Sequence, residues 1–200
     1  MLNGIDISHH NFYMQNLHEL NNLDFVIMKA TEGIRFRDPK MSTYMKVLKE
    51  DMLYGFYHFG RPDLGNDPED EATHFINTVN PYLSNRSILA LDIEAEALKV
   101  KELDKWCATF MQIVDITTGI LPMLYISIAE TKKFMATAAL GSGLWAGKWS
   151  KNKPTAKQLD PWKFWAIWQY TSEGIFSGRR VDLDIFNGSR EQFMKYCKGN

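Results

Sequence analysis

Two acidic residues, Asp92 and Glu94, directly follow the most hydrophobic run of the sequence, 88–91. Residues two apart on a β-strand project to the same side, with Cα atoms about 6.6 Å apart. Two such carboxyls on a buried strand repel when both are ionised, so the pKa of one should rise and leave a proton donor beside an anion. Glycosidic cleavage uses this pair, because an acid protonates the leaving oxygen while an anion stabilises or traps the positive sugar centre. A strand end with two solvated acids is the simpler alternative.

Two further acids favour the catalytic interpretation. Asp6 lies in the first strand-like run and Asp182 in the last. The first and last strands of a closed barrel are neighbours, so these carboxyls would approach one another at the catalytic end. Clustered buried carboxylates repel, and stability alone would disfavour them. Asp184 shares a face with Asp182 in a regular strand, or leaves the barrel as that strand ends.

Aromatic residues supply a second feature of a carbohydrate site, because flat apolar rings pack against sugars while a few polar groups fix their orientation. Most single aromatic residues belong to a core, which is the alternative for each of them. Trp149 also follows a strand-like run. We predict that the substrate is bound by Tyr57, Tyr125, Trp145, Trp168, Gln169, Tyr170 and His58.

The order of elements predicts an α/β fold, an abbreviated TIM-like barrel of the (β/α)₅β₃ type formed by one domain over residues 1–200. Five strand–helix units precede three strands with little helix between them, whereas a regular barrel needs about 250 residues. An open doubly wound sheet is the alternative. Strand-like runs are 3–7, 24–30, 53–59, 87–94, 120–126, 143–147, 164–170 and 180–185, and helical patterns are 14–22, 39–51, 68–79, 99–118, 128–138 and about 189–197.

Two helix starts carry a capping carboxylate before a proline, at 38–39 and at 67–68. The polar stretches 61–71 and 150–162 are long enough to form rim loops around a cleft.

Composition excludes several classes of protein. A formal net charge of −1 with no basic stripe argues against nucleic-acid binding. No run approaches the roughly 20 apolar residues of a membrane span, and no signal peptide precedes residue 4. No metal or cofactor is predicted, because His9 and His10 are adjacent and no EF-hand or phosphate-binding loop occurs. Cys107 and Cys197 are best interpreted as buried free thiols, with a disulfide still open.

Eight short motifs occur in an order that resembles the glycoside hydrolase family 25 lysozymes, the Chalaropsis type of bacterial autolysins and phage endolysins. They are Gly4-Ile-Asp-Ile-Ser8, Met28-Lys-Ala-Thr-Glu-Gly33, Tyr54-Gly-Phe-Tyr-His-Phe59, Leu91-Asp-Ile-Glu94, Leu124-Tyr-Ile-Ser127, Leu144-Trp-Ala146, Ile167-Trp-Gln-Tyr-Thr171 and Val181-Asp182. The resemblance implies a (β/α)₅β₃ barrel that hydrolyses the β-1,4 bond between N-acetylmuramic acid and N-acetylglucosamine in peptidoglycan. It also implies action on the bacterial cell wall by a monomer, after phage-type release from a host cytoplasm or as a trimmed secreted form.

By position in these motifs, Glu94 resembles the family's general acid, and Asp6, Asp92 and Asp182 resemble its other active-site carboxylates. Tyr57, Tyr125, Trp145 and Gln169 fall where related enzymes line the groove. The sequence departs at 9–11, where many relatives carry an aromatic residue followed by Gln-Gly, and this difference would alter sugar contacts at one rim. No cell-wall-binding repeats follow, as expected for a catalytic domain alone or for a fragment of a longer lysin.

The expected mechanism has Glu94 protonate the glycosidic oxygen while Asp92, with Asp182, orients the N-acetyl group whose carbonyl attacks the anomeric carbon. This substrate-assisted route retains the anomeric configuration. Direct attack by Asp6 or Asp92 and an inverting route through activated water stay open. Two other functions also stay open, a chitinase-like barrel glycosidase and a non-catalytic glycan-binding module.

Overall fold

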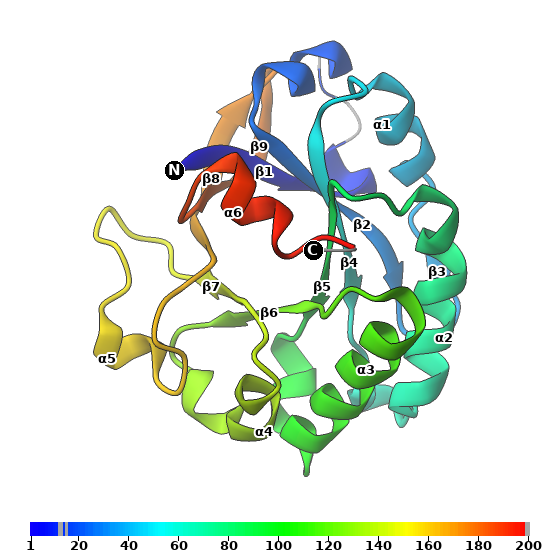
Figure 1. The fold of residues 1–200 in the computed structure, drawn as a ribbon, viewed down its shortest axis with the longest axis vertical. Coiled ribbons are helices and arrows are strands. Elements are labelled where there is room, and N and C mark those ends of the chain that lie inside the picture. Colours follow the sequence, from blue (N-terminus) through cyan, green and yellow to red (C-terminus); the bar gives the residue numbers. More distant parts are fainter. Residues whose placement is uncertain (12–13, 15, 199–200) are drawn as a thin grey trace.

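The computed structural model describes residues 1–11, 14 and 16–198 of the chain. Strands account for most of the centre of the molecule, and short connections or helices join them (Figure 1). The strands are β1 (Leu2–Ile7), β2 (Phe25–Glu32), β3 (Phe36–Arg37), β4 (Leu53–Phe59), β5 (Ser87–Asp92), β6 (Met123–Ser127), β7 (Leu144–Gly147), β8 (Ile167–Phe176) and β9 (Arg179–Phe186).

The sheet closes on itself because β1 pairs with both β2 and β9. From β1 through β2 and β4 to β8, neighbouring strands of the barrel run parallel. The last strand, β9, runs antiparallel to β8 and to β1. The two-residue strand β3 lies outside the ring, where it pairs only with β2. Closure of eight strands confirms the predicted barrel and excludes the open doubly wound sheet.

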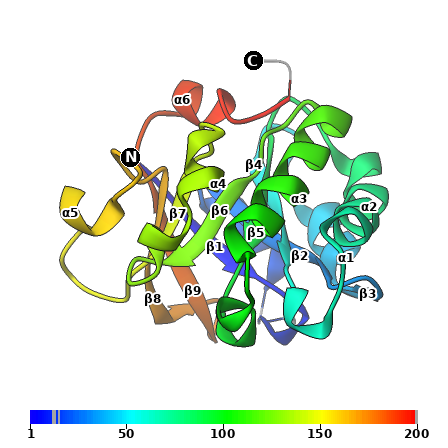
Figure 2. The ribbon, with the colours of Figure 1, turned by 90° about the horizontal axis from the view of Figure 1, so that it is seen from below.

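Helices cover one side of this barrel more than the other (Figure 1, Figure 2). Within the described residues, the α-helices are α1 (Met41–Val47), α2 (Pro68–Val79), α3 (Leu103–Thr118), α4 (Met135–Ala139), α5 (Ala156–Leu159) and α6 (Arg190–Met194). The longest two, α2 and α3, pack against each other beside β2, β4 and β5. The later connections are short, which is why 200 residues suffice for a barrel.

Local signals place some helix ends correctly and others not. Asp67 is the N-cap residue of α2 and Pro68 its first helical residue, as predicted, although the Asp67 side chain makes no capping hydrogen bond. The prediction at 38–39 is wrong, because α1 begins at Met41. The carboxylate of Asp38 instead accepts hydrogen bonds from the backbone N–H groups of His9 and Lys40.

Other predicted helices are shorter than expected. The pattern at 14–22 forms a 3₁₀ helix over Leu17–Asn22, and residue 15 lies outside the described residues. The pattern at 128–138 divides into a 3₁₀ turn, Thr131–Lys133, and α4. These segments take their form from packing on the barrel rather than from propensity, as expected for segments of less than about 12 residues.

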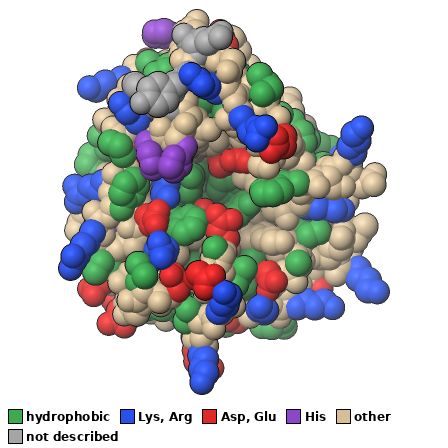
Figure 3. All heavy atoms as spheres, turned by 180° about the vertical axis from the view of Figure 1, so that it is seen from behind, with side chains coloured by type: hydrophobic (Ala, Val, Ile, Leu, Met, Phe, Trp, Pro, Cys, Tyr) green, Lys and Arg blue, Asp and Glu red, His purple; other side chains and the backbone are tan. Residues whose placement is uncertain are grey.

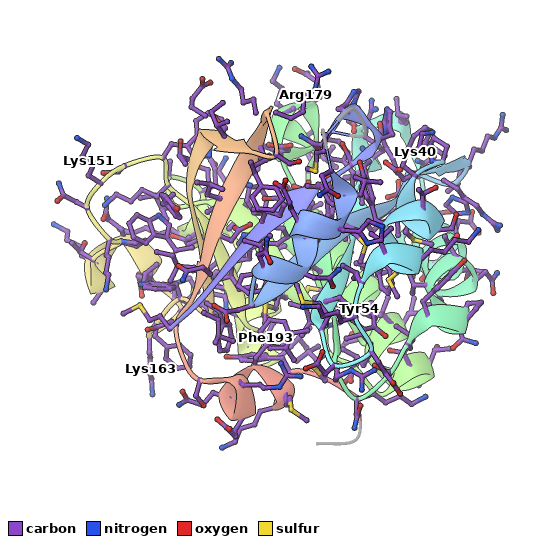
Figure 4. All side chains as sticks on the ribbon, turned by 90° about the horizontal axis from the view of Figure 1, so that it is seen from above. Lys40, Tyr54, Lys151, Lys163, Arg179 and Phe193 are labelled. Atoms are coloured by element: carbon purple, nitrogen blue, oxygen red, sulfur yellow. The ribbon has the colours of Figure 1, made fainter. Side chains whose placement is uncertain are left out.

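Side-chain alternation along the strands divides the apolar residues into two clusters. Inward positions such as Phe25, Ile88 and Phe186 form the core of the barrel, while outward positions such as Ile5 and Val26 pack with the helices. Phe193 of α6 closes the lower end of the barrel, with its ring 5.5 Å from that of Phe25 and 5.1 Å from that of Phe186 (Figure 4). The opposite end is thereby left as the place for a cleft.

The structure also bears on the two cysteines and on the possibility of a membrane span. Cys107 and Cys197 are both buried and free, which confirms the interpretation as thiols. In the part of the chain that the structure describes, the helices are too short or too polar to cross a bilayer.

Candidate active site

A cleft of about 430 Å³ opens at the end of the barrel opposite α6, where the parallel strands have their carboxyl ends. Figure 3 shows this face, with acidic side chains gathered around a hollow and histidines at its edge. The four predicted carboxylates, Asp6, Asp92, Glu94 and Asp182, all line the cleft. Acids that are scattered through the sequence are thus brought together by barrel closure.

The pairing of strands explains why these acids meet. Asp6 of β1 lies directly opposite Asp182 of β9 in the antiparallel register. Asp92 is the last residue of β5, and Glu94 follows two residues later on the same side. Because β9 runs antiparallel, its first half, and not its end, lies at the open end of the barrel.

Polar and aromatic side chains fix the floor of the cleft. The Gln169 amide donates to the Asp6 carboxylate, with 2.8 Å between Nε2 and Oδ2. Its carbonyl oxygen accepts from the Tyr125 hydroxyl and the Trp149 indole N–H, both at 2.9 Å. Two donors on one oxygen leave a single orientation of the amide, with its NH₂ group toward Asp6.

Aromatic rings line the cleft beside this network. Trp145 packs edge-on against Tyr125 and Tyr57, with ring centroids 5.0 and 6.2 Å apart. A Cβ at Gly147 would lie 2.9 Å from the Tyr125 hydroxyl oxygen, so only glycine leaves room for this ring. Tyr57, Tyr125, Trp145 and Gln169 therefore line the cleft, as the sequence predicts.

Three other predicted binding residues do not line it. His58 is fully buried behind the barrel wall, where it contacts Thr31 Oγ1 and Glu71 Oε2 at 2.7 Å each. Trp168 donates its indole N–H to the Lys148 carbonyl, and Tyr170 packs on Trp168. The reason is alternation: each of these residues is next to an inward-facing residue, Tyr57 or Gln169, and so points outward.

Lys29 lies in the cleft but is not among the residues predicted from the sequence. It lines the cleft, forms an ion pair with Glu32 at 2.6 Å, and lies 4.6 Å from the centre of the Phe59 ring. The sequence contains a signal for this position, because Lys29 is the one charged residue among the apolar residues 25–30 of a strand-like run. Trp149, which is largely exposed, is a second lining residue beyond those predicted to bind substrate.

Burial raises the pKa of each acid in this cluster. Burial, with the charge of Asp182 next, raises the pKa of Asp6 to about 8. Burial and then Glu94 raise the pKa of Asp182 to about 6. The pKa values of Asp92 and Asp184 lie well above the ordinary range for the same first reason. Burial and mutual repulsion thus favour the protonated forms of these carboxyls.

Burial raises the pKa of Asp92 and that of Glu94 to different extents. Asp92 is buried, and its Oδ1 has no hydrogen-bond partner among the described residues. Burial and the charge of Glu94 raise the pKa of Asp92 strongly. Burial also raises the pKa of Glu94, which is exposed to the cleft, and Lys29 opposes this rise. In the free protein the deeper Asp92 thus holds a proton more firmly than Glu94.

Within residues 1–11, 14 and 16–198, no three or more His, Cys, Asp or Glu side chains are arranged to hold a metal ion. The site therefore offers acid–base groups, one cation and apolar rings. This set suits protonation of a leaving group and stabilisation of a developing positive charge on a sugar.

The sequence profile described as Glycosyl hydrolases family 25 matches residues 5–179. The chain belongs to glycosyl hydrolase family 25. The matched segment contains Asp6, Asp92 and Glu94 and ends before Asp182, which its pairing with Asp6 brings into the same cleft.

Proteins similar to this chain come from bacteria and fungi. The uncharacterized protein YegX of Escherichia coli (strain K12) is 26% identical over 181 residues, which cover 88% of this chain and 64% of YegX. The N,O-diacetylmuramidase of Arthroderma benhamiae is 27% identical over 192 residues, covering 88% and 77%. A solved structure of a family GH25 lysozyme from Aspergillus fumigatus is 28% identical, with a TM-score of 0.81 and 99% of each chain covered. The chain thus spans 64% of the length of YegX.

The raised pKa values predict how stability depends on pH. A carboxyl whose folded pKa exceeds the unfolded value of about 3.9 binds more protons when folded, so its stabilising contribution is lost as pH rises through the folded pKa. For Asp182 and Asp6 the folded values are about 6 and about 8. We expect the urea midpoint of unfolding to fall between about pH 5 and pH 8.5.

Burial lowers the pKa of His58, which works in the opposite direction but involves a single group. The Asp182→Asn variant should show a smaller fall in the midpoint, whereas Asp70→Asn on the exposed face of α2 should match the wild type. A midpoint that rises over this interval would show that the clustered acids are ionised throughout.

Proposed function

We propose that this protein is a lysozyme, a muramidase that hydrolyses the β-1,4 bond between N-acetylmuramic acid and N-acetylglucosamine in peptidoglycan. The observation that carries the proposal is the convergence of Asp6, Asp92, Glu94 and Asp182 in one aromatic-lined cleft on a family 25 chain. Two of the similar proteins bear the names muramidase and lysozyme, which supports the same substrate class.

The four acids and the aromatic rings form one continuous cleft within residues 6–182. We therefore propose that residues 1–200 act as one catalytic domain and as a monomer on glycan strands of the bacterial cell wall, without nucleic acid or membrane insertion.

Glu94 is the proposed general acid, because it is the carboxyl of the pair that is exposed to the cleft. A glycan in the cleft displaces water from Glu94 and so favours its neutral form. The acetamido N–H of the sugar donates to Asp92, which favours the Asp92 anion. The proton thus moves from the deeper carboxyl to the one that reaches the glycosidic oxygen.

Bond cleavage follows from this placement. Glu94 gives its proton to the glycosidic oxygen as the C1–O bond breaks, and the acetamido carbonyl oxygen forms a bond to C1. The Asp92 carboxylate accepts a hydrogen bond from the N–H of the resulting cyclic cation and so stabilises it. Water then attacks C1 while Glu94 takes its proton back, and the configuration at C1 is retained.

The remaining acids and rings have supporting parts in this proposal. Asp6 and Asp182 face the same space from adjacent strands and stabilise positive charge at the sugar ring. Tyr57 and the largely exposed Trp149 offer apolar ring surfaces to the sugars, and Trp145 packs edge-on against Tyr57.

The chitinase-like alternative is less well supported by the same strand. That pattern requires additional Asp residues before Asp92, yet Ser87, Ile88 and Ala90 occupy these positions. Ala90 packs in the barrel core and Ser87 bonds to the Ser84 carbonyl, so neither adds an acid. A non-catalytic glycan-binding module would have no use for clustered buried acids, which cost stability.

The sugar at the new reducing end tests the proposed bond. Digestion of purified peptidoglycan should release fragments that end in N-acetylmuramic acid, and mass spectrometry after borohydride reduction identifies that sugar. Fragments that end in N-acetylglucosamine would place the cut at the other bond. Rapid turnover of chitin oligomers, beside slow turnover of peptidoglycan, would instead favour the chitinase-like activity.

Replacement of the general acid tests the role of Glu94. Glu94→Gln should lower kcat on cell walls by about 100- to 10,000-fold, the usual contribution of a positioned acid, with an unchanged thermal midpoint. Glu96→Gln is the matched control, because Glu96 lies two residues on and pairs with Lys99 at the exposed surface. Residual activity of Glu94→Gln near that of the control would assign the acid to another residue.

The anomer formed first tests the route. Proton NMR recorded early in the digestion of a soluble peptidoglycan fragment should show the β-anomer before mutarotation, because two displacements at C1 retain the configuration. An α-anomer at the earliest time would mean a single displacement by activated water, with Asp92 or Asp6 as its base.

A further inference from the structure

Asp184 is a buried acid for which the proposed reaction has no direct use. Its side chain is 1% exposed and lies inside the barrel, so it does not leave the barrel as β9 ends. In the register of the sheet it lies opposite Gly4 of β1 and Gln169 of β8, one inward position below Asp182. Gly4 adds no side chain to this layer, and the ring of Phe25 occupies the place where its Cβ would lie.

One carboxyl oxygen of Asp184 accepts a hydrogen bond, and the other has no donor nearby in the part of the chain that the structure describes. Its Oδ1 accepts a hydrogen bond from the Trp145 indole N–H at 2.8 Å. Its Oδ2 is buried and meets no donor among the described residues. A side-chain hydrogen bond joins Asp184 to Asp6. Two carboxyls form such a bond only when one of them keeps a proton, because two carboxylates are both acceptors.

The surroundings decide which carboxyl keeps the proton. Asp6 lies nearer the cleft and receives a donor from Gln169, which favours its ionised form. Asp184 lies deeper, and burial disfavours its charge most strongly. The same bond lowers the pKa of Asp6 and raises that of Asp184, which agrees with a proton on Asp184.

We propose that Asp184 is a positioning residue that stays protonated and donates a hydrogen bond from Oδ2 to Asp6, which orients Asp6 toward the cleft and stabilises the Asp6 anion when it forms. This inference rests on the proposed glycosidase function. With Gln169 on one side and Asp184 below, the Asp6 carboxyl is held in one orientation, and its anion meets two donors when it forms. Such a charge stabilises the positive sugar centre without reorganisation during the reaction.

Two substitutions at Asp184 distinguish a role as hydrogen-bond donor to Asp6 from a role in packing alone. In Asp184→Asn the amide NH₂ donates to Asp6 and the carbonyl oxygen still accepts from Trp145, so kcat on cell walls should stay within about threefold of the wild type. Asp184→Ala removes the donor to an ionised group, so kcat should fall about 10- to 100-fold. Asp104→Ala is the control for lost stability alone, because Asp104 caps α4 through the Ala136 and Thr137 N–H groups.

The pH profile of kcat provides a readout that packing alone would not move. In the wild type, loss of the Asp184 proton at high pH leaves two facing anions, whereas the amide of Asp184→Asn cannot ionise, so its alkaline limb should move to higher pH. The other titratable groups that face the pair are Asp182, Asp92, Glu94, Lys29, Tyr57 and Tyr125, and all are common to both proteins. Identical alkaline limbs would overturn the proposal.

Infrared difference spectra of the resting protein test the proton itself. At neutral pH, wild type minus Asp184→Asn should contain the C=O band of a protonated carboxyl, and a carboxylate band in its place would overturn the proposal. This result is independent of turnover. Failure of the wild type to hydrolyse peptidoglycan would refute the proposed function, while the infrared band would still report on Asp184.

Discussion

Strict alternation of side chains around a closed ring of strands is the constraint on which this structure depends. Once β1 pairs with both β2 and β9, each strand residue faces either the barrel interior or the surrounding helices. Lower inward positions are filled by rings such as Phe25 and Phe186, and the upper ones by acids. The same constraint removes His58 from the cleft and places it against Glu71 of α2. Site and core are therefore two ends of one column of inward-facing residues.

Crowding of acids in this column sets its chemistry. Asp6, Asp92, Glu94, Asp182 and Asp184 share a partly buried space with Lys29 as a lining cation, and burial is the first cause of every raised pKa. Full ionisation would be strongly unfavourable in such a space. Protons must therefore be distributed among the carboxyls. Burial raises the pKa of Asp92 and Asp184 well above the ordinary range, and that of Asp182 only to about 6.

Features that follow from the order of strands were predicted correctly from the sequence. Side-chain orientations and caps that depend on partners in distant segments were not. Strand order placed Asp6 beside Asp182, and an ordered set of motifs indicated the barrel, both of which the structure contains. Trp168 and Tyr170 were misplaced because the phase of alternation in β8 becomes known only when Gln169 is seen to contact Asp6. Asp38 was taken for a helix cap, yet its carboxylate also serves His9, 29 residues earlier in the chain. Such competition between local and distant partners is not visible in the local pattern.

The antiparallel last strand explains how so short a barrel builds a two-layer site. A parallel strand brings its final residues to the open end, as β5 does with Asp92. In β9 the direction is reversed, so residues after Asp182 descend into the barrel, and Asp184 reaches the layer beneath Asp6. One strand thereby supplies an acid at the surface of the cleft and another below it. Replacement of the last strand–helix units by a simple hairpin is, on this view, what gives the upper carboxyls support from beneath.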